Sequence, residues 1–366
     1  MNAIEKIAIT KIKGIGPKSS RLLLAYFGSL ENIFLSNKKE LQQIPGLSAN
    51  VIQQLLNKSF LAESEQELRF VEDQQIQLLW FEDELFPQRL KQCDDSPMLL
   101  YHKGTINLNQ PKVISVVGTR NATSYGKKLT EQLLNELKEF QVLVVSGLAF
   151  GIDIQAHRTA LQLKLPTTAV LGHSLDRIYP YEHSETAKEI MQAGSLLTEF
   201  PSGTLPDRMN FPMRNRIIAG LADVTIVVEA ANKGGALITA EIANSYDRDV
   251  CAYPGHVDQP YSAGCNYLIK TNKAHLIQEP QDLINLMQWK KNNQQKQNIG
   301  FQLPLMPSLS TDEKLVFDFL KDENQASIDD IAYYCKWPAS KLAVTLLEME
   351  MTGLIQTLPG KIYKLP

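Results

Sequence analysis

Cysteine is scarce in this chain: four residues in 366, far apart, at Cys93, Cys251, Cys265 and Cys335. They form no C-x-x-C pair, which argues against a zinc ribbon and against a disulfide scaffold. Long hydrophobic runs are missing too, because no stretch approaches the roughly 18 apolar residues of a membrane span, and the N-terminus has no apolar signal region. We therefore expect a soluble protein of the reducing cytoplasm, with no membrane contact.

Neither charge sign is in large excess. The chain has 37 Lys+Arg and 40 Asp+Glu, for a formal net charge of -3. This balance excludes a histone-like polybasic binder but permits a local basic site. Apolar residues make up 44% of the chain, enough to bury a core, and at about 150 residues per domain the length predicts two or three domains.

Residues 1–64 have the pattern of a helix-hairpin-helix, SAM-like helical domain. Two glycine-bearing turns, at 12–16 and 44–48, are each followed by an apolar helix. In the first turn Gly14, Gly16 and Lys18 could hold a DNA phosphate through backbone N–H groups, or the turn could serve packing alone. The second turn has Ser48 in place of the second glycine, so we expect it to be structural.

Residues 65–288 are predicted to form the central domain, where apolar strands alternate with amphipathic helices. Nearly continuous β-branched runs indicate strands buried on both faces, and therefore a doubly wound parallel sheet. Residues 65–108 are interpreted as a lead-in to this sheet that contains a turn-rich run at 86–104. The strands are expected at 113–117, 142–146, 168–171, 196–198, 224–228 and 250–253.

The polar, Gln/Asn-rich segment 289–308 is predicted to be a linker. After it, Ser310 and Glu313 have capping-box spacing, and three helices with a terminal hairpin over 309–366 indicate a winged helix. This unit has nine acidic residues against six lysines. Duplex phosphates would repel it, which favours a protein contact over groove reading.

Four strand-to-helix turns could carry chemistry. The first, 115–128, fits neither the P-loop nor the G-x-G-x-x-G spacing, which disfavours P-loop hydrolysis and ordinary NAD binding, yet its helix N-terminus near Ser124 would favour phosphate. In the second, 144–157, Asp153 and His157 lie four residues apart. The favoured interpretation is that Asp153 caps the helix or suits its dipole; the alternative is that the two form a general acid/base pair.

The third and fourth turns supply most of the positive charge. Arg214 and Arg216 are predicted in a loop just before an apolar helix, where arginines favour phosphate, and Lys233 precedes two glycines that open a helix. Because the carboxyl ends of parallel strands share one edge, the four turns together predict a polyanion or nucleotide site.

Several ordered motifs resemble the DNA-processing protein A (DprA/Smf) family of natural transformation. They run from about 86 to 277 and include VVGTRNATSYG, VVSGLAFGID, FPMRNRIIAGL and GGALITAEIA. The resemblance implies an extended Rossmann-like domain that binds and protects single-stranded DNA, loads the RecA recombinase and forms a homodimer, without catalysis, cofactor or metal. Carried over by motif, the DNA contacts would be Gly118, Thr119, Arg120, Gly147, Arg214, Asn215, Arg216, Lys233, Gly234 and Gly235.

Two departures from the family pattern concern this site. Phe150 stands where the family often has a basic residue, and could stack on a base; the run 233–236 lacks the usual hydroxyls. The alternative function is an enzyme of the nucleoside-monophosphate phosphoribohydrolase type, because Gly234 and Gly235 are followed by Glu241. A structural adaptor is a third reading, against which the arginines argue.

Overall fold

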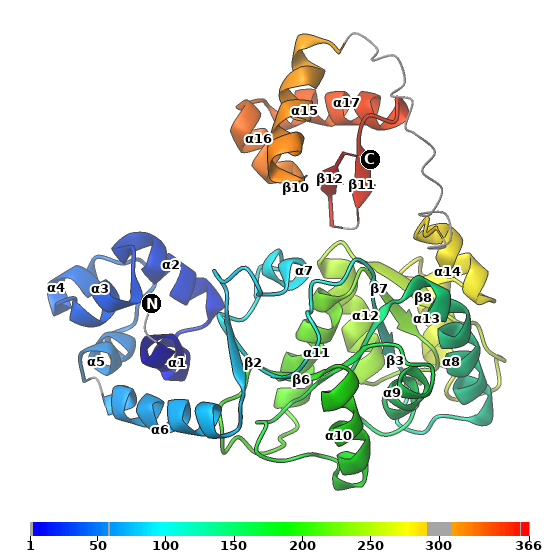
Figure 1. The fold of residues 1–366 in the computed structure, drawn as a ribbon, viewed down its shortest axis with the longest axis horizontal. Helices are drawn as coiled ribbons and strands as arrows, with labels where there is room; N and C mark the ends of the chain where they lie inside the picture. The colour runs from blue at the N-terminus through cyan, green and yellow to red at the C-terminus, as the bar shows by residue number, and fades with distance from the viewer. Residues whose placement is uncertain (1–2, 58, 291–308, 359, 366) are drawn as a thin grey trace.

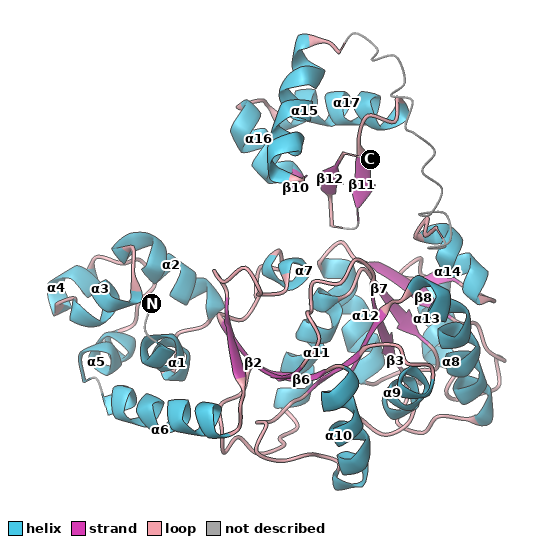
Figure 2. Ribbon diagram, viewed as in Figure 1, coloured by secondary structure: helices cyan, strands magenta, loops and turns pink. Residues whose placement is uncertain are grey.

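The structure is a computed structural model that describes residues 3–57, 59–290, 309–358 and 360–365. Three units follow one another along the chain: a helical unit, a central α/β unit and a small C-terminal unit (Figure 1). Strands are concentrated in the central unit, with helices on both sides of its sheet (Figure 2). The predicted fold class of a doubly wound α/β unit between a helix-hairpin-helix-like and a winged-helix unit is confirmed.

The N-terminal unit repeats a helix-turn-helix, as predicted. Gly14 and Gly46 turn the chain at φ +92° and +83°, a region that favours glycine. The predicted domain boundary at 64/65 falls inside a helix, and the apolar cluster of this unit continues into the first two strands through Trp80 and Tyr101. The helices are α1 (Ala3–Lys11), α2 (Pro17–Phe27), α3 (Leu30–Leu35), α4 (Lys38–Gln42), α5 (Ala49–Asn57) and α6 (Ser59–Asp73).

The central sheet has nine strands in the order β1-β2-β6-β5-β4-β3-β7-β8-β9. From β6 to β9 neighbouring strands are parallel, as predicted, whereas β1 and β2 add an antiparallel edge that the sequence did not indicate. Each predicted strand lies within one residue of its observed limits. The strands are β1 (Gln77–Trp80), β2 (Leu99–Gly104), β3 (Val113–Val117), β4 (Leu143–Ser146), β5 (Thr167–Val170), β6 (Ser195–Thr198), β7 (Val224–Val227), β8 (Asp249–Ala252) and β9 (His275–Leu276).

Alternating strand residues pack against helices on the two faces of this sheet. In β3, Val113 and Val117 join the apolar cluster of α7, α11, α12 and α13, and Ile114 and Val116 join that of α8, α9 and α14. The helices are α7 (Gln88–Lys91), α8 (Ser124–Leu137), η1 (Lys138–Phe140), α9 (Ile152–Gln162), η2 (Tyr181–His183), α10 (Ser184–Ala193), α11 (Asn210–Leu221), α12 (Gly235–Ser245), α13 (Ala263–Lys270) and α14 (Pro280–Leu286).

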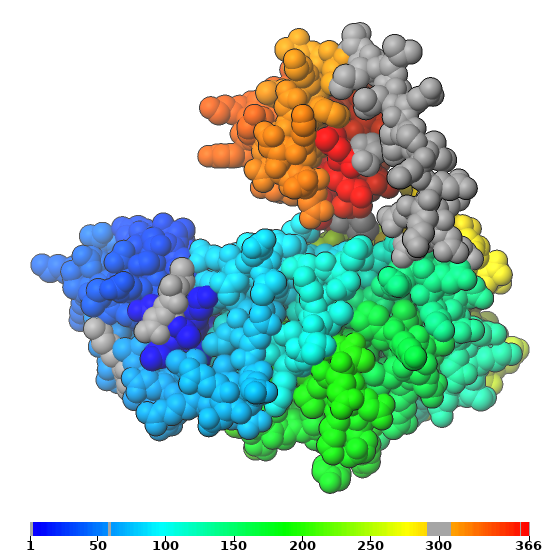
Figure 3. All heavy atoms as spheres, viewed as in Figure 1, coloured from blue at the N-terminus to red at the C-terminus, as the bar shows by residue number. Residues whose placement is uncertain are grey.

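The C-terminal unit has the predicted three helices and hairpin. Its capping box is present: the Ser310 hydroxyl accepts from the Glu313 N–H, and the Glu313 carboxylate accepts from the Ser310 N–H. Lys361 forms an ion pair with Asp247 of the central unit at 3.1 Å, and the unit forms a separate lobe in Figure 3. Most of the predicted linker lies outside the described residues. The elements are α15 (Thr311–Glu323), β10 (Gln325–Ser327), α16 (Ile328–Cys335), α17 (Ala339–Met351), β11 (Gln356–Leu358) and β12 (Ile362–Lys364), with sheet order β10-β12-β11.

Three features of the described residues concern membrane spans, cysteines and metal sites. No helix there is long and apolar enough to cross a bilayer. All four cysteines are buried and free of disulfide bonds. Within the same residues no group of three or more His, Cys, Asp or Glu side chains is placed to hold a metal ion.

Candidate nucleic-acid interface

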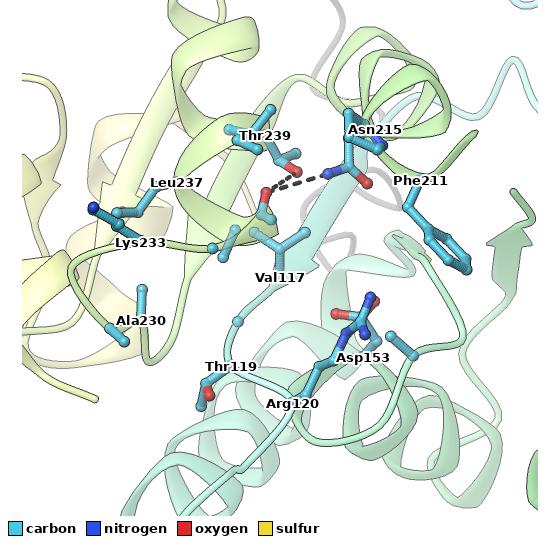
Figure 4. Close-up of a pocket in the computed structure, with 18 of the residues that line it drawn as sticks. Val117, Thr119, Arg120, Asp153, Phe211, Asn215, Ala230, Lys233, Leu237 and Thr239 are labelled. Atoms are coloured by element: carbon cyan, nitrogen blue, oxygen red, sulfur yellow. Dashed lines mark hydrogen bonds between the residues drawn. The ribbon is translucent and has the colours of Figure 1, made fainter. Parts of the chain in front are cut away.

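The strand order changes direction next to β3, because β4 lies on one side of it and β7 on the other. In doubly wound sheets such a switch point opens a crevice at the carboxyl ends of the strands. A pocket of about 780 Å³ lies there, between the β3–α8 turn, α11 and the β7–α12 turn (Figure 4). Ala149 and Asp153 of the β4–α9 turn line it as well, so the fold brings all four predicted turns to one concave site.

The pocket collects most of the residues predicted from the sequence. Gly147, Phe150 and Arg216 do not line it, and the N-terminal trio Gly14, Gly16 and Lys18 belongs to the helical unit. The predicted residues that do line it are Gly118, Thr119, Arg120, Arg214, Asn215, Lys233, Gly234 and Gly235.

The N-terminus of α12 is open toward this pocket. Gly234 precedes the helix at φ +154° and brings no capping side chain, and Lys233, Gly234 and Gly235 are all exposed. The Asn215 side chain donates to the Gly235 carbonyl oxygen at 3.2 Å, and the Thr239 hydroxyl donates to the same oxygen at 2.9 Å (Figure 4). The first turn is thus held in place while its N-terminal N–H groups remain available to an anion.

The N-terminus of α8 is occupied, contrary to the sequence-based expectation of a phosphate site there. The buried carboxylate of Glu229, just beyond β7, accepts from the Thr123 N–H at 2.9 Å and from the Thr123 hydroxyl at 2.6 Å. A Cβ at Gly126 would lie 2.1 Å from that carboxylate, so glycine makes room for it. An internal acid fills the position predicted for phosphate.

Arg214 lies inside α11 and is 4% exposed, which corrects its predicted place in a loop. Its guanidinium donates to the carbonyl oxygens of Gly147 and Val170, at the ends of β4 and β5. Burial lowers the pKa of Arg214 to about 10, an effect that the nearby Asp153 carboxylate opposes. A Cβ at Gly147 would lie 2.6 Å from both side chains, so Gly147 provides space for them.

Arg216 also lies within α11, not in the predicted loop, and does not line the pocket. Its guanidinium bonds the Glu199 carboxylate and donates to the Asp95 carbonyl oxygen at 2.6 Å. Burial raises the pKa of Glu199, and Arg216 opposes that shift. Both predicted phosphate-binding arginines therefore bond the protein's own oxygens, although the buried Nε of Arg214 has no hydrogen-bond partner among the described residues.

The accessible positive charge of the pocket comes from Arg120, Arg208 and Lys233. All three are exposed and line the pocket, and no ion pair between described residues includes any of them. The Arg120 guanidinium lies 5.6 Å from the ring centre of Phe211, which in turn lies 6.2 Å from that of Tyr179. Arg208, Phe211 and Tyr179 were not predicted from the sequence, although the first two belong to the same arginine-bearing segment.

Phe150 lies outside the residues that line the pocket. Its ring is 44% exposed and meets His183 edge-on, with ring centres 4.8 Å apart. A strand confined to the pocket would therefore not reach it.

The geometry gives no support to either catalytic reading. His157 is fully buried, bonds the Thr167 hydroxyl at 2.7 Å and does not line the pocket. Burial lowers its pKa to about 3. Asp153 does line the pocket, from the first turn of α9, where an acid suits the helix dipole, but the buried His157 is not there to pair with it. Glu241 of the hydrolase reading pairs with Lys273 at 3.3 Å and also lies outside the pocket lining.

The N-terminal hairpin residues remain open to solvent. Gly14 and Gly16 are exposed, and α2 begins at Pro17 without a side-chain cap. Lys18 is exposed and lies 3.4 Å from the carboxylate of Asp94, a weak surface pair. This turn is thus available as a second phosphate contact.

Three family models match the chain. Residues 77–288 match DNA recombination-mediator protein A, residues 304–361 match the DprA winged helix domain, and residues 7–58 match the SAM-like helix-hairpin-helix tandem. The chain is also 30% identical to protein Smf of Synechocystis, over 98% of this chain and 97% of that protein.

Two solved structures are similar as well. DNA processing protein A of Streptococcus pneumoniae gives a TM-score of 0.68 at 32% identity, covering 78% of this chain and 98% of that one. The structure of DNA processing protein A of Helicobacter pylori, which concerns its single-stranded DNA binding mode, gives a TM-score of 0.53 at 31% identity. It covers 59% of this chain and 97% of that one.

Proposed function

This chain belongs to the DNA-processing protein A (DprA/Smf) family, and we propose that it binds single-stranded DNA in the pocket beside β3 as part of natural transformation. The observation that carries the proposal is convergence: Arg120, Arg208 and Lys233 and the open N-terminus of α12 meet in one pocket of about 780 Å³. The Helicobacter pylori relative, whose structure concerns single-stranded DNA binding, supports the choice of ligand.

Each part of the pocket has a separate role in this proposal. The N–H groups of α12 and the three cations neutralise phosphates, while Phe211 and Tyr179 offer ring faces to an unpaired base. Since phosphates and stacked rings carry little base identity, binding should be nearly independent of sequence. We retain Gly118, Thr119, Asn215, Gly234 and Gly235 as lining residues, and assign Arg214, Arg216 and Gly147 to holding α11 in place.

A second phosphate contact at Gly14, Gly16 and Lys18 is proposed for a strand that leaves the pocket toward the helical unit. Phe150 is proposed only as a stacking position for such a longer strand. From family membership alone we further propose that the bound strand is protected, that it passes to the RecA recombinase, and that the protein acts as a homodimer without catalysis.

Fluorescence anisotropy with labelled single-stranded and duplex oligonucleotides at two salt concentrations tests the site. We expect Arg120→Ala/Lys233→Ala to weaken single-strand binding by about tenfold or more and to reduce its salt dependence. The matched control is Lys127→Ala/Lys128→Ala, which removes two exposed lysines of α8 outside the pocket. Equal affinities of both variants and the wild type would move the DNA away from this pocket, and a loss in Lys18→Ala alone would move it to the helical unit.

A further inference from the structure

The C-terminal unit carries a second pocket, of about 560 Å³, which the proposed DNA site does not use. It lies between α15, β10 and α16 on the lobe that stands apart in Figure 3. The side chains that give it chemical character are three aromatic rings, two carboxylates and one ammonium group: Phe319, Tyr333, Tyr334, Glu323, Asp330 and Lys336.

The aromatic rings of this pocket are accessible, and two of them stack on each other. Phe319 and Tyr334 are stacked, with ring centres 4.3 Å apart and an angle of 21° between the rings. Tyr334 is 50% exposed and the neighbouring Tyr333 is 88% exposed. Ring faces that water can reach at the edge of a hollow attract flat cations, because the face of an aromatic ring is electronegative.

The charge of the pocket selects for a cation as well. Glu323 at the end of α15 and Asp330 in the first turn of α16 are both exposed, and no ion pair among the described residues includes either carboxylate. The Asp330 carboxylate accepts from the N–H and hydroxyl of Ser327, so Glu323 is the more available of the two. Lys336 is the single cationic side chain of the lining. Two carboxylates against one ammonium group, on a unit with an acidic excess, disfavour nucleic-acid phosphates.

We propose that this pocket binds an arginine side chain in a basic segment of a partner protein. A guanidinium is planar, so it can stack on Tyr333 or Tyr334, and it donates in two directions to carboxylates such as that of Glu323. Lysine offers a point charge without the stacking surface, so arginine should be preferred. The proposal does not depend on where the DNA binds.

The test uses the full chain and an immobilised library of octapeptides. One central position is fixed as Arg, Lys, Leu or Asp, and the others are mixtures of Ala, Gly, Ser and Leu. We expect the Arg pool to retain roughly three- to tenfold more protein than the Leu pool, with Lys between them. Tyr334→Ala and Glu323→Gln should each reduce the Arg preference severalfold, while the matched control Glu348→Gln, an exposed glutamate of α17 outside the pocket, should leave it unchanged.

Three outcomes would overturn the proposal: a preference for the Leu or Asp pool, an Arg preference that is unchanged in both pocket variants, or a loss of oligonucleotide binding in those variants. The last would assign the pocket to nucleic acid. The Arg120→Ala/Lys233→Ala variant should keep the Arg preference, so failure of the DNA site and failure of this pocket are distinguishable. Thermal melting of Tyr334→Ala and Glu323→Gln shows whether each variant is folded, so that a folding defect is not taken for a binding defect.

Discussion

The N-termini of α8 and α12 both follow a strand at the same edge of the sheet, and both have the backbone N–H groups and the dipole that attract anions. At α8 the protein supplies the anion itself, through the buried Glu229 carboxylate. At α12 no acidic residue occupies the first turn and the position is open to the pocket. A helix N-terminus is thus an anion site for a ligand only where no internal carboxylate has taken its place.

Removing the internal acid should have the largest effect. Glu229→Ala leaves the half-buried Thr123 N–H and hydroxyl without their acceptor, which we expect to lower the free energy of unfolding by about 2–3 kcal/mol. Urea denaturation measures this, with Glu136→Ala on the exposed face of α8 as control. A loss equal to that of the control would contradict the assignment of Glu229 as the occupant of this N-terminus.

The buried His157 of α9 should make the free energy of unfolding depend on pH. His157 on α9 has a folded pKa of about 3, below its unfolded value near 6.5, so the unfolded chain binds more protons between these pH values. Stability should therefore fall as the pH drops from about 6.5 toward 5, at about 1.4 kcal/mol per pH unit when His157 alone titrates. Buried Asp153 has a raised pKa, a shift with the opposite sign that acts from about pH 4 upward.

Urea denaturation between pH 5 and pH 7 measures this slope. His157→Gln keeps a polar side chain beside Thr167 but cannot titrate, so its slope should be smaller by most of that amount. The same slope in variant and wild type would show that other groups cause the pH dependence.

The strands and the four turns could be predicted because they are local properties of the sequence. Continuous β-branched runs identify parallel strands, and glycines identify turns. The side chain that occupies a turn comes from a distant part of the sequence: Glu229 lies 106 positions from Thr123, and Arg214 bonds carbonyl oxygens at the ends of β4 and β5. The β1–β2 edge was missed because its sequences, QLLW and LLYHKG, have none of the β-branched residues that mark the parallel strands, and these strands are defined by their antiparallel pairing.

An acidic residue placed at the N-terminus of α12 should compete for its N–H groups, as Glu229 does at α8. A Cβ at Gly235 would lie 3.5 Å from the Asn215 side chain, so a substitution fits. We expect Gly235→Asp to weaken single-strand binding by about tenfold, because its carboxylate competes with phosphate for the N–H groups of α12, and to leave stability nearly unchanged. Anisotropy compares it with the neutral Gly235→Asn; equal losses in both would mean that the charge at this position does not matter.

The smallest expected effect concerns which arginines reach the ligand. Arg208 is exposed and lines the pocket, whereas Arg216 in the same segment is paired with Glu199. Arg208→Ala should therefore weaken single-strand binding about threefold and reduce the salt slope by about 0.7, the value for one phosphate contact. Arg216→Lys, which keeps the charge but not the paired donors, should lower the unfolding temperature and leave that slope unchanged. If instead the slope falls with Arg216 and not with Arg208, then α11 rearranges on binding and the buried pair opens to the DNA.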